Sequence, residues 1–165
     1  MAEALSPEAE QELAALRDAL AGELDEQVVA AQWFRPPGWG SPLKGVGRFF
    51  KRLGGKEPQD RLRATNVMAL TPSRVVAYTL GTASGSMRAG KALAEWPRTE
   101  VSVGSEGHTV QTTKQVPDMM PDHTQTDMTL VTLRGRGGRP LLLEGDFPRG
   151  ELTRHLVESI RGAAG

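Results

Sequence analysis

The N-terminal part of the chain carries apolar residues at helical spacing. Leu5, Ala9, Leu13, Leu16 and Leu20 recur at intervals of three and four residues, which predicts a helix with one narrow apolar stripe. Serine and proline at positions 6 and 7 favour a helix start there, because a serine hydroxyl accepts from free backbone N–H groups and proline fits the first helical position. A stripe this narrow packs either on a sheet or on another subunit.

A second helical pattern closes the chain. Its apolar face is formed by Leu152, Leu156, Val157 and Ile160. Glu151 stands near its start and Arg161 near its end, as the helix dipole favours. The pattern predicts a C-terminal helix from about Pro148 to Arg161.

Between the helices, short runs rich in Val, Thr and aromatic residues predict strands. The first is 27–34. Two more, 66–70 and 74–80, flank Thr71-Pro72-Ser73, where proline presets the turn of a tight hairpin. Further strands are expected at 92–97, 100–103, 108–116, 127–133 and 140–144, with loops at 81–90, 104–107, 117–126 and 134–139.

These elements predict an α+β fold: about seven antiparallel strands in a curved sheet or partly open barrel, with a C-terminal capping helix and an extra N-terminal helix. We expect the N-terminal amphipathic helix in residues 1–26 and the strand-rich domain in 27–162. A long basic loop at 35–62 interrupts this domain.

The hairpin segment resembles proteins of a known superfamily. In 66–80 (NVMALTPSRVVAYTL) an apolar strand ends in Leu-Thr, and a tight turn, an arginine and another apolar strand follow. This order is similar to that of bacterial members of the pleckstrin-homology-like (PH-like) superfamily, whose next strand pair would begin near Glu95–Pro97. The resemblance covers 27–162, without the 35–62 loop, and implies a module that binds lipids, peptides or proteins and is usually not an enzyme.

Charge is unevenly distributed along the chain, although its net value is zero. Residues 1–27 hold eight acidic residues and one basic residue, whereas 35–63 hold eight basic and two acidic residues. Either these two segments lie against each other, or the basic loop meets an anionic partner. The acidic N-terminus is not typical of a signal peptide, and no run approaches the ~20 apolar residues of a membrane span. We therefore expect a cytoplasmic protein, with the membrane surface as the alternative location.

Catalytic and metal-binding patterns are weak. The chain has no cysteine, so disulfides and thiol nucleophiles are excluded. Four candidate ligands cluster near one predicted loop, Asp118, Asp122, His123 and Asp127. Their spacing is not that of a known metal site, and no serine lies in a G-x-S-x-G motif. We predict no metal, no cofactor and no catalytic residue.

The segment Gly85–Lys91 has the glycine and lysine spacing of a phosphate-binding loop. Ala92 follows, however, where such loops need the hydroxyl that holds magnesium. A nucleotide-binding enzyme that uses loop 85–91 is therefore the least favoured alternative.

A basic and aromatic segment at 42–56 (PLKGVGRFFKRLGGK) is the strongest candidate for an interaction site. The candidate residues are Trp39, Lys44, Arg48, Phe49, Phe50, Lys51 and Arg52. Bases beside exposed aromatics suit an anionic lipid surface, and they also suit a protein partner. The alternatives are that the phenylalanines anchor a solvated loop, or that the bases bind nucleic acid, which is less favoured. Trp33 and Trp96 are predicted core residues.

The sequence thus predicts a non-catalytic binding or interaction module whose partner is another protein or subunit. Peripheral binding to an anionic membrane through 43–56 is the alternative.

Overall fold

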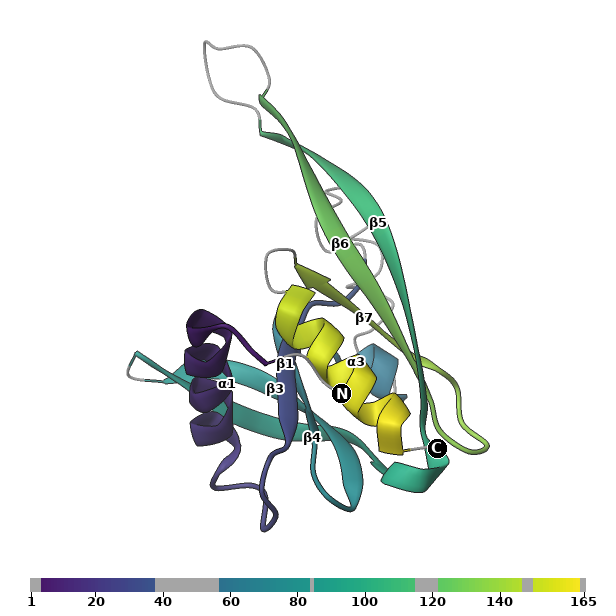
Figure 1. The fold of residues 1–165 in the computed structure, drawn as a ribbon. Coiled ribbons are helices and arrows are strands. Elements are labelled where there is room, and N and C mark those ends of the chain that lie inside the picture. Colours follow the sequence, from purple (N-terminus) through teal and green to yellow (C-terminus); the bar gives the residue numbers. More distant parts are fainter. Residues whose placement is uncertain (1–3, 38–56, 84, 115–121, 147–149, 164–165) are drawn as a thin grey trace.

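The computed structural model describes residues 4–37, 57–83, 85–114, 122–146 and 150–163. In these residues the chain forms two antiparallel sheets and two α-helices, shown in Figure 1. One sheet has the strand order β1-β2-β3-β4, and the other has the order β5-β6-β7. The predicted α+β class is confirmed, whereas the two sheets do not form a closed barrel.

The first sheet contains the predicted hairpin. It consists of β1 (Ala30–Phe34), β2 (Asn66–Leu70), β3 (Arg74–Ala83) and β4 (Ser86–Pro97). Strands β2 and β3 pair around Thr71, whose N–H and hydroxyl both donate to the Arg74 carbonyl. All five residues of β2 are buried, because both faces of the sheet are covered. The 66–80 hairpin is therefore confirmed.

The second sheet consists of β5 (Ser102–Lys114), β6 (Asp122–Arg134) and β7 (Leu141–Asp146). Two short 3-10 helices precede it in the chain: η1 (Pro58–Arg61) lies between β1 and β2, and η2 (Arg98–Glu100) lies between β4 and β5. The predicted hairpin of 127–133 with 140–144 is confirmed by the pairing of β6 with β7.

Three predicted loops are wholly or partly strand. Residues 81–90 belong mostly to β3 and β4, because Gly85, at a φ of 80°, makes a short turn between them. Residues 104–107 do not form a turn but continue β5 without a shift in register. Glycine at these exposed positions weakens the strand without ending it. Residues 122–126 of the predicted 117–126 loop belong to β6, and 115–121 lie outside the described residues.

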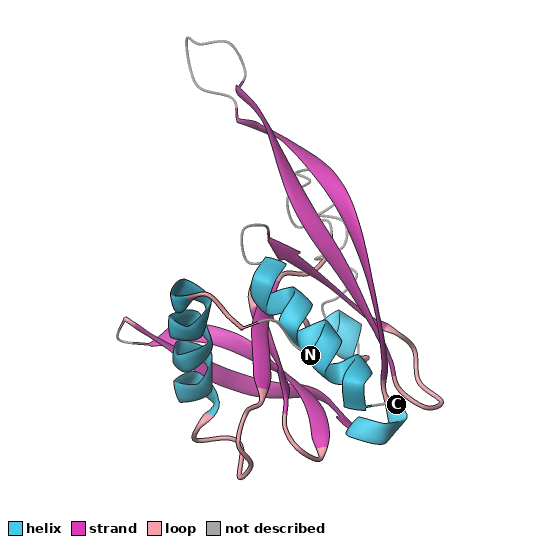
Figure 2. Ribbon diagram, in the orientation of Figure 1, coloured by secondary structure: helices cyan, strands magenta, loops and turns pink. Residues whose placement is uncertain are grey.

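Helix α1 (Pro7–Leu20) covers the outer face of the first sheet (Figure 2). The Ser6 hydroxyl accepts from the Ala9 N–H at 3.3 Å, as predicted for the cap. Leu13, Leu16 and Leu20 are at most 1% exposed and pack on alternating residues of β1, β2 and β3. The narrow apolar stripe is thus buried within its own chain.

Helix α3 (Gly150–Ala163) packs between the two sheets (Figure 2). Leu156, Val157 and Ile160 join the main core with residues of both sheets. The predicted start at Pro148 lies outside the described residues, and the helix continues to Ala163, beyond the predicted end at Arg161. Among the described helices, neither is long and apolar enough to cross a membrane.

Candidate functional site

A β-hairpin projects from the body of the molecule. Strands β5 and β6 pair from Ser102–Arg134 to Lys114–Asp122, whereas β7 pairs with β6 only from Met128 to Leu133. The outer part of the hairpin is therefore a two-stranded ribbon, and Figure 1 shows it extending beyond the helices and the other strands. We call this outer part, residues 109–114 and 122–127, the arm. An isolated two-stranded ribbon is only marginally stable in water, so an arm of this kind gains from a further strand.

The register shows which backbone groups of β5 face away from the sheet. In antiparallel strands, residues alternate between facing one neighbour and facing the other. Glu144 of β7 exchanges two 2.8 Å backbone hydrogen bonds with Arg35, so even-numbered residues of β7 face away from β6. The odd-numbered residues of β7 therefore face β6, where they lie opposite odd-numbered residues. The even-numbered residues of β6 then face β5, where they lie opposite even-numbered residues. The backbone groups of the odd-numbered residues of β5 consequently point outward.

A side-chain contact supports this assignment independently. Arg161 of α3 donates to the outward carbonyl of Val103 at 3.4 Å. Beyond Val103, the outward N–H and C=O groups belong to Ser105, Gly107, Thr109, Gln111 and Thr113. Strand β5 is the last strand of its sheet in the described structure. No described strand pairs with these groups, and they form a continuous edge, which we call the β5 edge.

The β5 edge lacks the features that usually protect such edges. Proteins block exposed strands with prolines, bulges, short strands or frequent charges. Strand β5 has thirteen residues, an unbroken register and no proline, and its only Lys, Arg, Asp or Glu residues are Glu106 and Lys114. Residues 104–107 are all exposed. An edge of this kind favours the addition of a strand from a partner.

The opposite edge of the same sheet is closed. Beside the Arg35–Glu144 bridge, the Gln59 side chain accepts from the Leu142 N–H at 2.7 Å and donates to the Leu142 carbonyl at 3.1 Å. The glutamine amide thus takes the place of a neighbouring strand. The two edges of the three-stranded sheet differ, and the β5 edge is the one left for a partner.

The seven residues predicted to form the interaction site, Trp39 and the bases and phenylalanines of 44–52, lie outside the described residues. Arg35 precedes that segment and Gln59 follows it, and both are hydrogen-bonded to β7. The turn from β6 to β7 begins close by and holds Arg134, Arg136 and Arg139, all exposed and without an ion pair to any described residue. The spacing R-G-R-G-G-R was the sequence signal for this second basic segment.

The acidic N-terminal residues have a partner in the first sheet. Arg74 of β3 lies 2.8 Å from Asp25 and 3.2 Å from Glu26, and a third contact joins it to Glu95 at 2.9 Å. These contacts raise the pKa of the Arg74 guanidinium, chiefly through the hydrogen bond to Glu95. Asp25 and Glu26, both in the acidic N-terminal segment, are therefore engaged within the fold.

The segment with the spacing of a phosphate-binding loop is a strand. Gly85 forms the turn and residues 86–91 belong to β4, where the Lys91 N–H donates to the Thr79 hydroxyl at 2.8 Å. A phosphate-binding loop leads into a helix whose N-terminus faces the phosphate. Strand β4 offers no such helix end.

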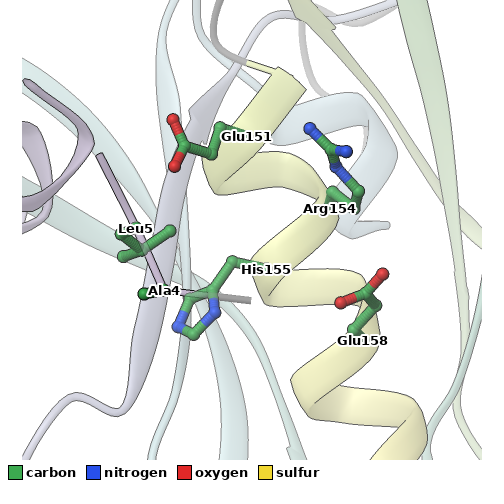
Figure 3. A pocket seen from close by; sticks show the side chains of 6 residues that line it. All are labelled: Ala4, Leu5, Glu151, Arg154, His155 and Glu158. Carbon is green, nitrogen blue, oxygen red and sulfur yellow. The ribbon is translucent and has the colours of Figure 1, made fainter. Parts of the chain in front are cut away.

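A small open pocket lies where the chain before α1 meets α3 (Figure 3). Glu151 and His155 line it on the side of α3 that faces Ala4 and Leu5. The carboxylate of Glu151 is already engaged, because it accepts from the Ser6 N–H at 2.6 Å and from the Ser6 hydroxyl at 2.7 Å. These bonds lower the pKa of Glu151. The pocket is therefore a packing contact between the start of α1 and α3, and not a ligand site that the structure supports.

The two tryptophans predicted for the core lie at its margins. Trp33 in β1 and Trp96 in β4 are each partly buried against a core cluster. The Trp33 indole N–H donates to Glu12 at 3.1 Å, and the Arg35 guanidinium lies 5.4 Å from its ring centre. Among the described residues, no three His, Asp or Glu side chains come together as metal ligands.

Comparison with known proteins finds no match: no family model fits the chain, and neither a curated protein nor a solved structure is significantly similar to it.

Proposed function

We propose that this chain is a non-catalytic interaction module of PH-like fold, and that it binds a protein partner by main-chain pairing along the β5 edge. The observation that carries the proposal is the unbroken outward edge from Ser105 to Thr113, beside which no described strand lies and whose residues 105–107 are exposed. Main-chain hydrogen bonds along such an edge supply affinity, and the side chains on either face supply specificity.

The PH-like assignment is supported by the order of elements. Four strands, three strands and a C-terminal helix that contacts both sheets follow one another in the chain, as the resemblance of 66–80 implies. Helix α1 is an addition to that arrangement. A fold alone does not determine a function, so the β5 edge, and not the fold, carries the proposal.

The test is photo-crosslinking in the cells that naturally make the protein. A p-benzoylphenylalanine at the exposed position 105 reports what lies beside the β5 edge. We expect an adduct that persists in Gln111→Thr and is lost in Gln111→Pro, because proline removes an outward N–H and leaves the pairing of β5 with β6 in place. The absence of any adduct, or an adduct that survives Gln111→Pro, would contradict the proposal.

Binding to an anionic membrane through residues 43–56 is a second candidate function. It is favoured by the exposed arginine turn 134–139, which leads into β7, the strand that is hydrogen-bonded to Arg35 before the segment and to Gln59 after it. Each base near an anionic bilayer contributes about 1 kcal/mol to binding.

Co-sedimentation with vesicles tests this second function. We expect the protein to pellet with anionic vesicles and remain soluble with neutral ones, and we expect physiological salt to weaken the binding. A variant with Lys44, Arg48, Lys51 and Arg52 changed to Glu should stay in solution. Equal pelleting of the parent and this variant would exclude the segment as a lipid site.

A further inference from the structure

The proposed function does not identify the protein that binds the β5 edge. The β5 edge is complementary to itself. We propose that the strand which adds to β5 is β5 of a second copy of the chain, antiparallel to the first, with Val110 on the two-fold axis. This inference rests on the proposed function and names its partner.

The outward-facing residues allow this pairing. In an antiparallel strand pair, a residue whose N–H and C=O groups point into the interface lies opposite a residue whose groups also point into it. An axis at Val110 places Gly107 opposite Thr113 of the second copy and Thr109 opposite Gln111. All four face outward in the register derived above. The pairing therefore uses the free N–H and C=O groups of the β5 edge.

The charges of β5 select this register among its neighbours. With the axis at Val110, Glu106 lies opposite Lys114 of the second copy, and symmetry repeats this pair on the other side of the axis. An axis one residue further along would place Lys114 opposite His108, and an axis one residue earlier would place it opposite Gly104. Opposite charges across a strand pair are favourable, and like charges are unfavourable.

No described strand lies beside this stretch of β5. Arg161 of α3 contacts the Val103 carbonyl, and residues 105–107, which lie beyond it, are exposed. Between Glu106 and Lys114 the strand has neither proline nor a further acid, lysine or arginine. Pairing of two copies would join the two three-stranded sheets into one continuous sheet across the axis and would give each arm the third strand that it lacks.

Sedimentation of charge-reversed variants tests the register. Glu106→Lys creates two lysine–lysine pairs across the interface, one on each side of the axis, and Lys114→Glu creates two glutamate–glutamate pairs. We expect each variant alone to dimerise roughly tenfold more weakly than the parent, because two favourable pairs become two unfavourable ones. An equimolar mixture of the two variants should dimerise like the parent, because every lysine then faces a glutamate. Circular dichroism confirms that each variant is folded.

The mixture is the decisive sample, because a change that merely disturbs folding would not be repaired by adding a second disturbed chain. A parent that remains monomeric at every concentration, or variants that associate as well as the parent, would overturn the inference. In either case a crosslinked adduct with a different protein at position 105 would leave the proposed function standing. A parent dimer that survives Gln111→Pro would show that the copies meet elsewhere and would also overturn it.

Discussion

Docking of α1 on the first sheet is worth a large share of the stability, and Leu16→Ala tests this. The Leu16 side chain has no exposed surface and lies among apolar side chains of the sheet and helix. Removing a fully buried leucine side chain costs about 2–5 kcal/mol, from lost transfer free energy and from the cavity that remains. In a domain of this size, each kcal/mol lowers the melting temperature by about 2–4 °C.

Urea denaturation, monitored by circular dichroism, measures the free energy of unfolding. Gln11→Ala is the matched control, because Gln11 lies on the exposed side of the same helix. Surface substitutions of this kind change stability by about 0.5 kcal/mol or less. A loss below about 1 kcal/mol in Leu16→Ala would refute the docking of α1, because a solvated leucine would leave no cavity.

Two further substitutions probe joints of the fold. Glu151→Gln should destabilise the protein at neutral pH, because it replaces the carboxylate that accepts two hydrogen bonds from Ser6. The pKa of Glu151 is lowered from its ordinary value of 4.5, so the stabilisation is present above that pH and is lost as the pH falls through the lowered folded-state pKa. Denaturation curves at several pH values should therefore show the parent's advantage shrinking in acid, and a constant difference would contradict this account. Gly135→Ala should lower the melting temperature, because its Cβ would overlap the Trp96 indole. Gly138→Ala is the control, because no atom lies within 4 Å of its added carbon. Equal melting temperatures of the two variants would show that the Trp96 side chain moves aside without destabilising the protein.

The sequence was most informative where one local signal dominated. The turn at 71–73 and the apolar stripe of α1 each follow from a few neighbouring residues, and both were predicted correctly. Local signals could not show that Ser6 contacts Glu151, because 145 residues separate them. They also could not show that α1 packs on its own sheet, because a narrow leucine stripe fits either partner.

The sequence does not predict the β5 edge, because glycine at positions 104 and 107 favours a turn. Gly104 and Gly107 divide the run 100–116 in the sequence, yet β5 passes through both of them. A strand that is polar on both faces also lacks the alternation that marks a half-buried strand. The available signal was different: the threonine- and valine-rich composition of 109–113 and the absence of proline from 98 to 116.

Amide hydrogen exchange along β5, measured residue by residue at a high concentration of the purified parent protein, tests the central claim most directly. If the β5 edge is paired, the outward amides of Gly107, Thr109, Gln111 and Thr113 exchange slowly, like the inward amides of Glu106 and Thr112. Dilution should then release the outward amides first. If the outward amides exchange freely at every concentration while the inward ones stay protected, the edge carries no second copy, and the self-pairing described here is wrong.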